Sequence, residues 1–200
     1  MEEYKEPFQE EDEEKEKKGR FQSSLYDWGE ALIMSLIFIV LLFTFVVRLI
    51  GVSGSSMFPT LHDHDVMVVS NLGYTPERGD IVVLNKDDGN KESPIQGPIV
   101  KRVIARGGDQ VDIDFALGRV YVNGEELQED YVNDFDLPMD DEGIAFPQTV
   151  PEGCLFVMGD NRNQSTDSRS PELGMIDERC VIGHVLAVVW PLENFGGKTA

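Results

Sequence analysis

The chain has 200 residues, with 37 acidic and 17 basic side chains and a formal net charge of -20 at pH 7. Its length predicts one modest domain with appendages, and its acidity argues against nucleic acid as a partner because a phosphate backbone would be repelled. Two cysteines, Cys154 and Cys180, are too few for a disulfide framework. Their spacing does not decide between a pair and two free thiols, and the interpretation we favour is two small, buried hydrophobic side chains.

The N-terminal part of the chain combines a charged segment with a long apolar run. Residues 1–27 are predicted to form an acidic, disordered tail, because a charged stretch of low complexity cannot bury apolar surface. Residues 31–47 carry no charge, and a membrane-spanning helix needs about 17 to 25 apolar residues. Tyr26 and Trp28 precede the run, where an aromatic belt would lie at the membrane interface. We therefore expect a transmembrane anchor helix over residues 28–51.

Two other interpretations of the apolar run are less favoured. A cleaved signal peptide has a shorter apolar core of about 7–15 residues and an A-x-A-like cleavage site, whereas here Arg48-Leu49-Ile50-Gly51 follows. A buried core helix would need surroundings that the β-rich remainder does not offer.

The basic residues that precede the run are Lys15, Lys17, Lys18 and Arg20, and only Arg48 follows closely. By the positive-inside rule, the chain crosses the cell membrane once, with a cytoplasmic N-terminus and residues 52–195 outside.

The remaining sequence is typical of a mostly β fold. Short β-branched runs bounded by turn residues predict strands. These runs are Val66–Val69, Asp80–Leu84, Ile99–Ala105, Arg119–Val122, Leu155–Met158 and Val185–Trp190. Asn123-Gly124 predicts a two-residue hairpin. We expect antiparallel sheets or a partly closed barrel, with a small secondary lobe at about residues 107–150 and a short tail at residues 196–200.

The segment Gly54–Leu61 places several hydroxyls beside a glycine, a methionine and a turn-forming proline. A serine becomes a nucleophile only when a base takes its proton. His62 and His64 lie in a polar turn, where a solvated turn is favoured over a metal site because the spacing is short and no cysteine is near. His184 lies in a strand-like run, where a structural histidine is the default interpretation. The histidines are therefore weak candidates for the base.

Lys101 is a better candidate for the base. The alternation of a strand puts Lys101 on the same face as Ile99 and Val103. An amine held against apolar side chains loses hydration, and this lowers its pKa as a lysine general base requires. The alternative is an edge-strand lysine that extends into water, and periodicity alone favours that alternative.

A third polar segment, Gly159–Arg169, follows a predicted strand. Unpaired polar groups are costly in a core, so this segment is either a solvated loop or a packed network that supports a site. Within it, Asp167 and Arg169 could pair, and Ser165 or Ser168 could hydrogen-bond an amine.

Three segments together resemble the hallmark boxes of type I signal peptidases. They are Ser56–Leu61, the strand with Lys101-Arg102 that leads to Gly107-Gly108-Asp109, and Gly159–Arg162 continuing through Ser165–Arg169. They occur in the family's order behind an N-terminal anchor, and the resemblance covers about residues 30–195. It implies a membrane-bound serine/lysine-dyad protease that removes signal peptides from exported preproteins through an acyl-enzyme. No metal or other cofactor is implied.

The resemblance also implies roles for individual residues. Ser56, which directly precedes the methionine, would be the nucleophile and Lys101 the general base. Ser165 would orient the lysine amine, and Asp167 with Arg169 would form a supporting ion pair. Gly54 stands where some family members supply a serine hydroxyl to the oxyanion hole, so the backbone N–H of Ser56 would have to contribute instead.

Substrate recognition is also an expectation from the resemblance. The family cuts after small residues at the first and third positions before the bond, and an extended substrate could add to a sheet edge. The residues expected to bind it are Val52, Met57, Leu61 and Val100. The expected partners are signal peptides of preproteins, the lipid bilayer and the protein export machinery, with no nucleic acid.

Two alternatives to a signal peptidase remain at this point. Self-cleaving repressors share a related serine/lysine fold, but they carry a DNA-binding helix-turn-helix where this chain has an apolar run. A membrane-anchored β module without catalysis is the other. Such a module has no reason to hold a serine hydroxyl and a buried amine together, so the distance between Ser56 and Lys101 discriminates.

Overall fold

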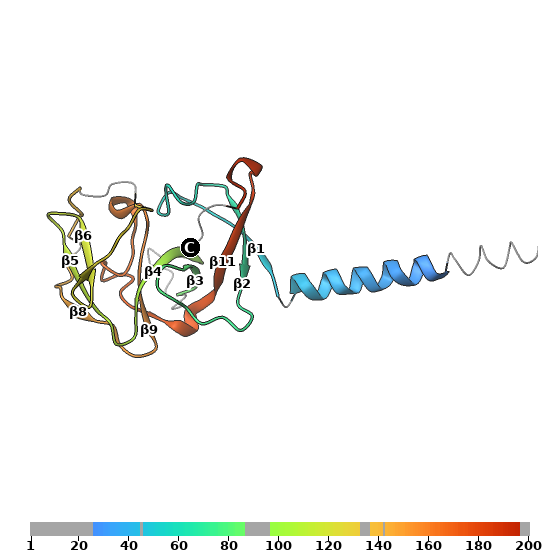
Figure 1. Ribbon diagram of the computed structural model, residues 1–200, viewed down its shortest axis with the longest axis horizontal. Coiled ribbons are helices and arrows are strands. Elements are labelled where there is room, and N and C mark those ends of the chain that lie inside the picture. The colour runs from blue at the N-terminus through green and yellow to red at the C-terminus, as the bar shows by residue number, and fades with distance from the viewer. Residues whose placement is uncertain (1–25, 45, 87–96, 133–136, 142, 197–200) are drawn as a thin grey trace, which may run out of the picture. The chain divides into compact units, whose positions relative to one another are not determined.

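The computed structural model describes residues 26–44, 46–86, 97–132, 137–141 and 143–196 (Figure 1). The chain divides into two compact units, Met1–Phe45 and Val46–Ala200, which we describe separately. The predicted acidic tail up to residue 25 and the C-terminal residues 197–200 lie outside the described residues. The proposed domain limits at these ends therefore stay predictions.

In the first unit the structure describes a helix over Tyr26–Thr44, of 19 residues. It is long and apolar enough to cross a membrane, and none of its most apolar window is buried against protein. Large side chains such as Phe38 (65% exposed) and Phe43 (50% exposed) are uncovered, and lipid is the environment in which such a surface is stable. The helix is compatible with a single-pass membrane anchor.

The structure corrects the predicted end of this helix at residue 51. The helix ends at Thr44, and Arg48–Gly51 form strand β1. Strand β1 pairs antiparallel with β2 (Val66–Ser70), with Arg48 opposite Val69 and Gly51 opposite Val66. The backbone groups of β1 find partners in β2, so the apolar residues at positions 49 and 50 belong to a sheet and not to the helix.

The second unit consists of two antiparallel sheets (Figure 1). Besides β1 and β2, the larger sheet contains β3 (Ile81–Leu84), β4 (Ile99–Arg106), β9 (Cys154–Met158), β10 (Ile176–Asp177) and β11 (Val181–Trp190). The strand order in this sheet is β1-β2-β11-β3-β4-β9-β10. The smaller sheet has the order β7-β6-β5-β8 and comprises β5 (Gln110–Asp114), β6 (Arg119–Val122), β7 (Glu125–Glu126) and β8 (Gln148–Thr149). The described part of this unit also contains short 3-10 helices: η1 (Arg162–Gln164), η2 (Glu178–Cys180) and η3 (Leu192–Asn194). The predicted fold class, mostly antiparallel β with a small second sheet behind an apolar helix, is confirmed.

The smaller sheet is an insertion between two neighbouring strands of the larger one, because β5 to β8 lie between β4 and β9 in the sequence. The predicted hairpin joins β6 to β7 at Asn123 and Gly124. Both residues have positive φ, at 55° and 80°, as a two-residue hairpin turn of this type requires.

The centre of the larger sheet is buried and apolar. All four residues of β3 are fully buried, because the strand lies between β11 and β4 and apolar clusters cover both of its faces. The two cysteines are free and half-buried, with Cys154 and Cys180 packed against different clusters. Strand β4 enters this environment with a lysine and an arginine, at positions 101 and 102, that are both buried.

Candidate active site

The structure brings Ser56 and Lys101 together. Lys101 lies in the middle of β4, opposite Val82 of β3 in the antiparallel register. Ser56 lies in the turn that follows β1. The Lys101 Nζ donates a hydrogen bond to the Ser56 Oγ at 2.9 Å, which is within the reach expected of a nucleophile and its base.

The environment of Lys101 favours a neutral amine. The residue is only 4% exposed, and burial lowers the pKa of its ammonium group from the usual value because a charged group loses hydration there. The Asp167 carboxylate opposes this shift, whereas the Arg169 guanidinium adds to it. The net pKa is lowered, so more of the amine is free to accept a proton than in an exposed lysine.

The turn that carries Ser56 is fixed by the loop after β9. The backbone N–H of Asn161 donates to the Ser56 carbonyl at 3.0 Å, and its side-chain amide donates to the Ser55 carbonyl at 3.1 Å. The Thr60 hydroxyl donates to the Asp160 carboxylate at 2.5 Å. Two of the segments picked out in the sequence are therefore in direct contact.

The Ser56 N–H points to no acceptor among the residues that the structure describes. Gly54, two residues earlier, has a φ of 95°, a conformation that side-chain-bearing residues rarely adopt. Its own N–H donates to the Asp63 carboxylate at 2.9 Å. The backbone at this position therefore suits glycine, and a serine hydroxyl there would require strained or altered geometry.

The segment Gly159–Arg169 is a packed network and not a solvated loop. Asp167 and Arg169 are both fully buried and pair at 2.8 Å, with a second bond at 2.9 Å. The Asp167 carboxylate also accepts from the Gly159 N–H at 3.0 Å. The Arg169 guanidinium donates in turn to the Arg162 carbonyl at 2.5 Å. The expected pair is thus formed, and it ties both ends of the segment together.

Ser165 lies inside this network, but its expected bond to the lysine amine is not formed. Its Oγ is buried and has no hydrogen-bond partner within the described part of the chain. The position of the hydroxyl is nevertheless close to the nucleophile turn. A Cβ added at Gly159 would lie 2.5 Å from both the Ser165 Cβ and the Ser56 carbonyl oxygen. The role of Ser165 stays a prediction.

A small cavity of about 110 Å³ opens beside the dyad. Three of the four residues expected to bind substrate, Val52, Met57 and Val100, line it. Further lining residues, which were not predicted from the sequence, are Ile50, Gly51, Ser53, Val83, Pro98 and Ile99. The structure corrects the expectation that Leu61 binds substrate. Leu61 is 1% exposed and belongs to the apolar core with Met57, and it is not among the residues that line the cavity.

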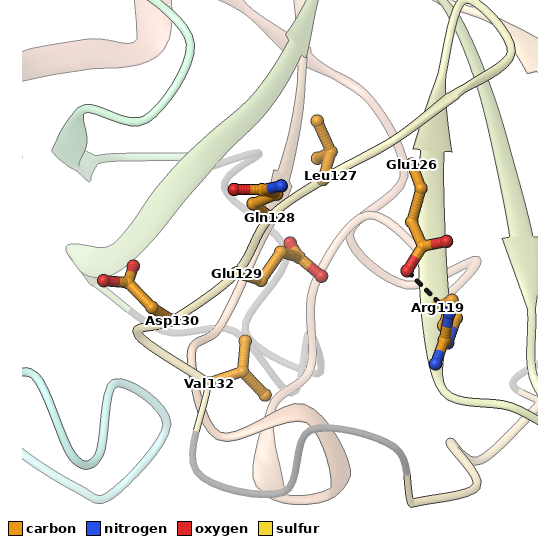
Figure 2. Close-up of a pocket in the computed structure, with 7 residues that line it drawn as sticks. All are labelled: Arg119, Glu126, Leu127, Gln128, Glu129, Asp130 and Val132. Atoms are coloured by element: carbon orange, nitrogen blue, oxygen red, sulfur yellow. Dashed lines mark hydrogen bonds and ion pairs between the residues drawn. The ribbon is translucent and has the colours of Figure 1, made fainter.

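A larger pocket, of about 760 Å³, lies elsewhere (Figure 2). It is lined by Arg119, Val132 and the residues from Glu126 to Asp130. None of the predicted site residues takes part in it, so size alone does not identify the reactive centre. One of its lining residues, Glu129, binds Arg162, which directly follows the Asn161 that contacts Ser56.

Two buried ion pairs were not foreseen. Arg102 donates twice to the Asp160 carboxylate, at 2.8 and 2.7 Å. Arg162 donates twice to Glu129, at 2.8 and 2.6 Å. The partners are 58 and 33 residues apart in the chain, so local sequence patterns carry no signal for either pair. Adjacency to Lys101 was the one available indication for Arg102.

None of the histidines contacts the dyad through an interaction seen in the described residues. His184 stacks on Tyr74 with ring centroids 4.0 Å apart. His62 lies 3.9 Å from the Asp65 carboxylate, and the His64 side chain is 91% exposed. Lysine is thus the basic side chain that lies within reach of the Ser56 hydroxyl.

Comparison with known proteins identifies the family to which the chain belongs. Residues 25–190 match the family model for signal peptidase, peptidase S26. Signal peptidase I of Bacillus licheniformis is 35% identical over 187 residues, which cover 90% of this chain and 96% of that protein. Signal peptidase I S of Bacillus subtilis (strain 168) is 35% identical over 185 residues, covering 86% and 93%.

A crystal structure of a signal peptidase I from Enterococcus faecalis V583 is 31% identical, with a TM-score of 0.41, over 56% of this chain and 97% of that chain. The family match spans most of the sequence, and the curated relatives are covered almost completely. The chain therefore belongs to the peptidase S26 family of signal peptidases and is a serine endopeptidase.

Proposed function

We propose that this chain removes N-terminal signal peptides from exported preproteins, with Ser56 as the nucleophile and Lys101 as the general base. The observation that carries the proposal is the 2.9 Å contact between the Lys101 Nζ and the Ser56 Oγ, made by an amine that is 4% exposed. An exposed lysine would be protonated and unable to accept a proton at neutral pH. Burial removes that obstacle, because it lowers the pKa of the amine.

The reaction then proceeds in two halves. The neutral Lys101 amine takes the Ser56 proton while the Oγ attacks the scissile carbonyl carbon, forming a tetrahedral intermediate. The resulting ammonium returns the proton to the leaving nitrogen of the mature protein, and the signal peptide stays on Ser56 as an ester. Lys101 next takes a proton from water, and the hydroxide attacks the ester carbonyl. The ammonium returns that proton to the Ser56 Oγ as the ester bond breaks, so the signal peptide leaves with a free carboxyl group and the neutral amine is restored.

The negative charge on the oxygen of the tetrahedral intermediate must be stabilised by a hydrogen-bond donor. The Ser56 N–H meets this need because, among the described residues, none accepts from it. Donors that are already in place and unpaired stabilise an oxyanion without reorganisation. Gly54 supplies no hydroxyl here, and its positive φ argues that this chain works without one.

Asp167, Arg169 and Ser165 support the dyad in this proposal. The buried ion pair holds the segment that carries Ser165 and places a carboxylate near the lysine. The Ser165 hydroxyl, buried and unpaired in the described structure, is available to the Lys101 amine when substrate binding rearranges the site.

The cavity beside the dyad supports cleavage after small residues. Its volume of about 110 Å³ is small, and Val52, Met57 and Val100 give it apolar walls. A short apolar side chain can enter such a cavity, whereas a large one would need its walls to move. We propose that residues before the scissile bond place small side chains there, with the peptide extended as in strand addition.

Lipid and the export machinery complete the proposed setting. The apolar helix Tyr26–Thr44 anchors the chain in the cell membrane, with the N-terminus cytoplasmic because basic residues precede the helix. Preproteins reach the enzyme from the export machinery on the other side.

A membrane-impermeant maleimide tests this orientation with Leu72→Cys, a position that is 70% exposed, after both native cysteines are changed to serine. Labelling of intact cells is expected, and labelling only after lysis would reverse the orientation.

Variants of the two serines and the lysine test the chemistry. Ser56→Ala and Lys101→Met should each abolish cleavage of a synthetic preprotein in detergent or lipid. Ser55→Ala is the matched control, because the Ser55 hydroxyl contacts Gln164 at 3.3 Å instead of the lysine, and it should retain cleavage. Activity in Ser56→Ala with loss in Ser55→Ala would move the nucleophile by one residue.

A further inference from the structure

The inserted lobe is the part of the chain between β4 and β9, which forms the smaller sheet. One short segment of this lobe, residues 127–132, contacts the residues that surround the dyad. It follows β7 and lines the large pocket of Figure 2. Glu129 is 2% exposed, although its neighbours Gln128 and Asp130 are exposed. Figure 2 shows the carboxylates of Glu129 and Asp130 pointing away from each other. A buried acid within an exposed acidic stretch needs a specific partner, and Glu129 has two.

The first partner is Arg162, at the start of η1. Its guanidinium donates to both Glu129 oxygens, at 2.8 and 2.6 Å, and both side chains are almost completely buried. The remaining donor of the same guanidinium, Nε, binds the Gly159 carbonyl at 3.1 Å. The Arg162 carbonyl accepts from Arg169 at 2.5 Å. Glu129 therefore fixes the arginine that closes the turn after β9.

That turn is in contact with the nucleophile. Asn161, which lies between Asp160 and Arg162, donates its N–H to the Ser56 carbonyl at 3.0 Å. At the start of the turn, the Gly159 N–H donates to Asp167 at 3.0 Å. A shift of the turn would move the backbone of Ser56 and the segment that carries Ser165 at the same time.

The second partner is Tyr131, which leads to the lysine strand. Its hydroxyl donates to Glu129 at 2.9 Å, and its ring faces the Arg102 guanidinium carbon, which lies 4.0 Å from the ring centroid. Burial and the nearby Glu129 carboxylate raise the pKa of the Tyr131 hydroxyl, so it stays protonated and acts as the donor. Arg102 directly follows Lys101 on β4 and binds Asp160 twice.

We propose that Glu129 and Tyr131 are positioning residues, which hold the turn at Ser56 and the strand at Lys101 in register from the inserted lobe. Neither side chain touches the dyad, so both act through Arg162 and Arg102. Bidentate, charge-assisted bonds in a low-dielectric interior are directional, and a fully satisfied buried network specifies one arrangement. The inference rests on the proposed Ser56/Lys101 chemistry.

The test measures kcat and KM separately for the full-length enzyme in detergent, with a synthetic preprotein. Tyr131→Phe keeps the ring over Arg102 and removes only the hydroxyl, and Glu129→Gln removes the charge. Each should lower kcat by about 10- to 100-fold, because a displacement of the reacting groups by about 1 Å costs about 100-fold and a smaller shift costs less, while KM stays unchanged. Glu129→Asp, which keeps the charge, should recover part of the lost kcat.

The control is Glu126→Gln, in the same segment. Glu126 pairs with Arg119 at 2.8 Å on the surface (Figure 2), so this variant should retain wild-type kcat and KM. Wild-type kcat in a folded Glu129→Gln or Tyr131→Phe enzyme would overturn the proposal, as would a change in KM alone. If Glu129→Gln fails to fold, Tyr131→Phe alone decides by the same criterion.

Two further arms separate this inference from the chemistry on which it rests. Wild type and Ser56→Ala are assayed in parallel. Cleavage by Ser56→Ala, or no cleavage by wild type, would refute the dyad, and the positioning proposal would fall with it. With wild type active and Ser56→Ala inactive, normal kcat in the Glu129 and Tyr131 variants refutes the positioning proposal alone.

Discussion

Gly159 is the position where a single methyl group should do most damage to catalysis. The residue is buried at the start of the turn after β9. A Cβ added there would lie 2.5 Å from the Ser56 carbonyl oxygen and from the Ser165 Cβ, and still closer to the Ser165 Oγ. Its φ lies outside the left-handed region, so alanine is acceptable to the backbone. The whole effect of Gly159→Ala must therefore come from displacement of its neighbours.

The size of the effect follows from those contacts. Inserting a methyl group into a well-packed site costs about 1–3 kcal/mol of unfolding free energy. For a domain of this size, each kcal/mol corresponds to about 2–4 °C in Tm, so Tm should fall by roughly 2–12 °C. The displaced atoms belong to the nucleophile turn, and a shift of about 1 Å lowers kcat by about 100-fold. Both quantities should therefore change.

The assay compares Tm and kcat for Gly159→Ala with the same quantities for Gly107→Ala. A Cβ at Gly107 would meet the backbone of Glu152 at 2.9 Å and of Gly153 at 3.0 Å, again without a positive φ. This control has a milder clash, and no dyad residue is among its three nearest contacts. It should lose stability and keep kcat. Wild-type kcat in Gly159→Ala, with any change in Tm, would refute the argument that this turn sets the position of Ser56.

Further predictions concern the buried pair and the orienting hydroxyl. Asp167→Asn leaves the fully buried Arg169 without its counter-charge, so the free energy of unfolding measured by urea titration should fall by about 3–5 kcal/mol. Arg179→Ala, in the exposed pair with Asp177 that has the same spacing, should leave the urea midpoint unchanged. Ser165→Ala removes no bond made to the described residues and should change stability by less than about 0.5 kcal/mol. Its kcat should fall at constant KM, and full activity would argue against any contact with the lysine.

The strands were largely predictable because their local composition is distinctive. Each predicted run overlaps an observed strand, and Asn123-Gly124 specifies its own hairpin. Among the strands of the described residues, β5, β7, β8 and β10 were not predicted, and neither was β1. Strand β1 was missed because Leu49 and Ile50 continue an apolar run, and composition does not mark where a helix gives way to a sheet. The backbone partners in β2 decide that boundary, and they lie about 20 residues away in the sequence.

Site residues that belong to a local sequence motif were predictable, whereas those whose role depends on tertiary contacts were not. Periodicity put Lys101 on an apolar face, but the same pattern fits an edge strand, and only the position of β4 between β3 and β9 makes it buried. Glu129 gave no signal, because it sits in an acidic stretch with exposed neighbours. Its burial depends on the guanidinium of Arg162, a residue of η1 that lies 33 positions later in the sequence.

The most direct test of the dyad is the dependence of kcat/KM on pH for a synthetic preprotein. Only the neutral Lys101 amine accepts the Ser56 proton, so the rate should rise with pH through the pKa of that amine. Burial lowers this pKa from 10.5, and the rising limb should lie below that value. Lys101→Met should show no cleavage at any pH. A Lys101→Met enzyme that cleaves with the same rising limb would assign the base to another group and contradict the account.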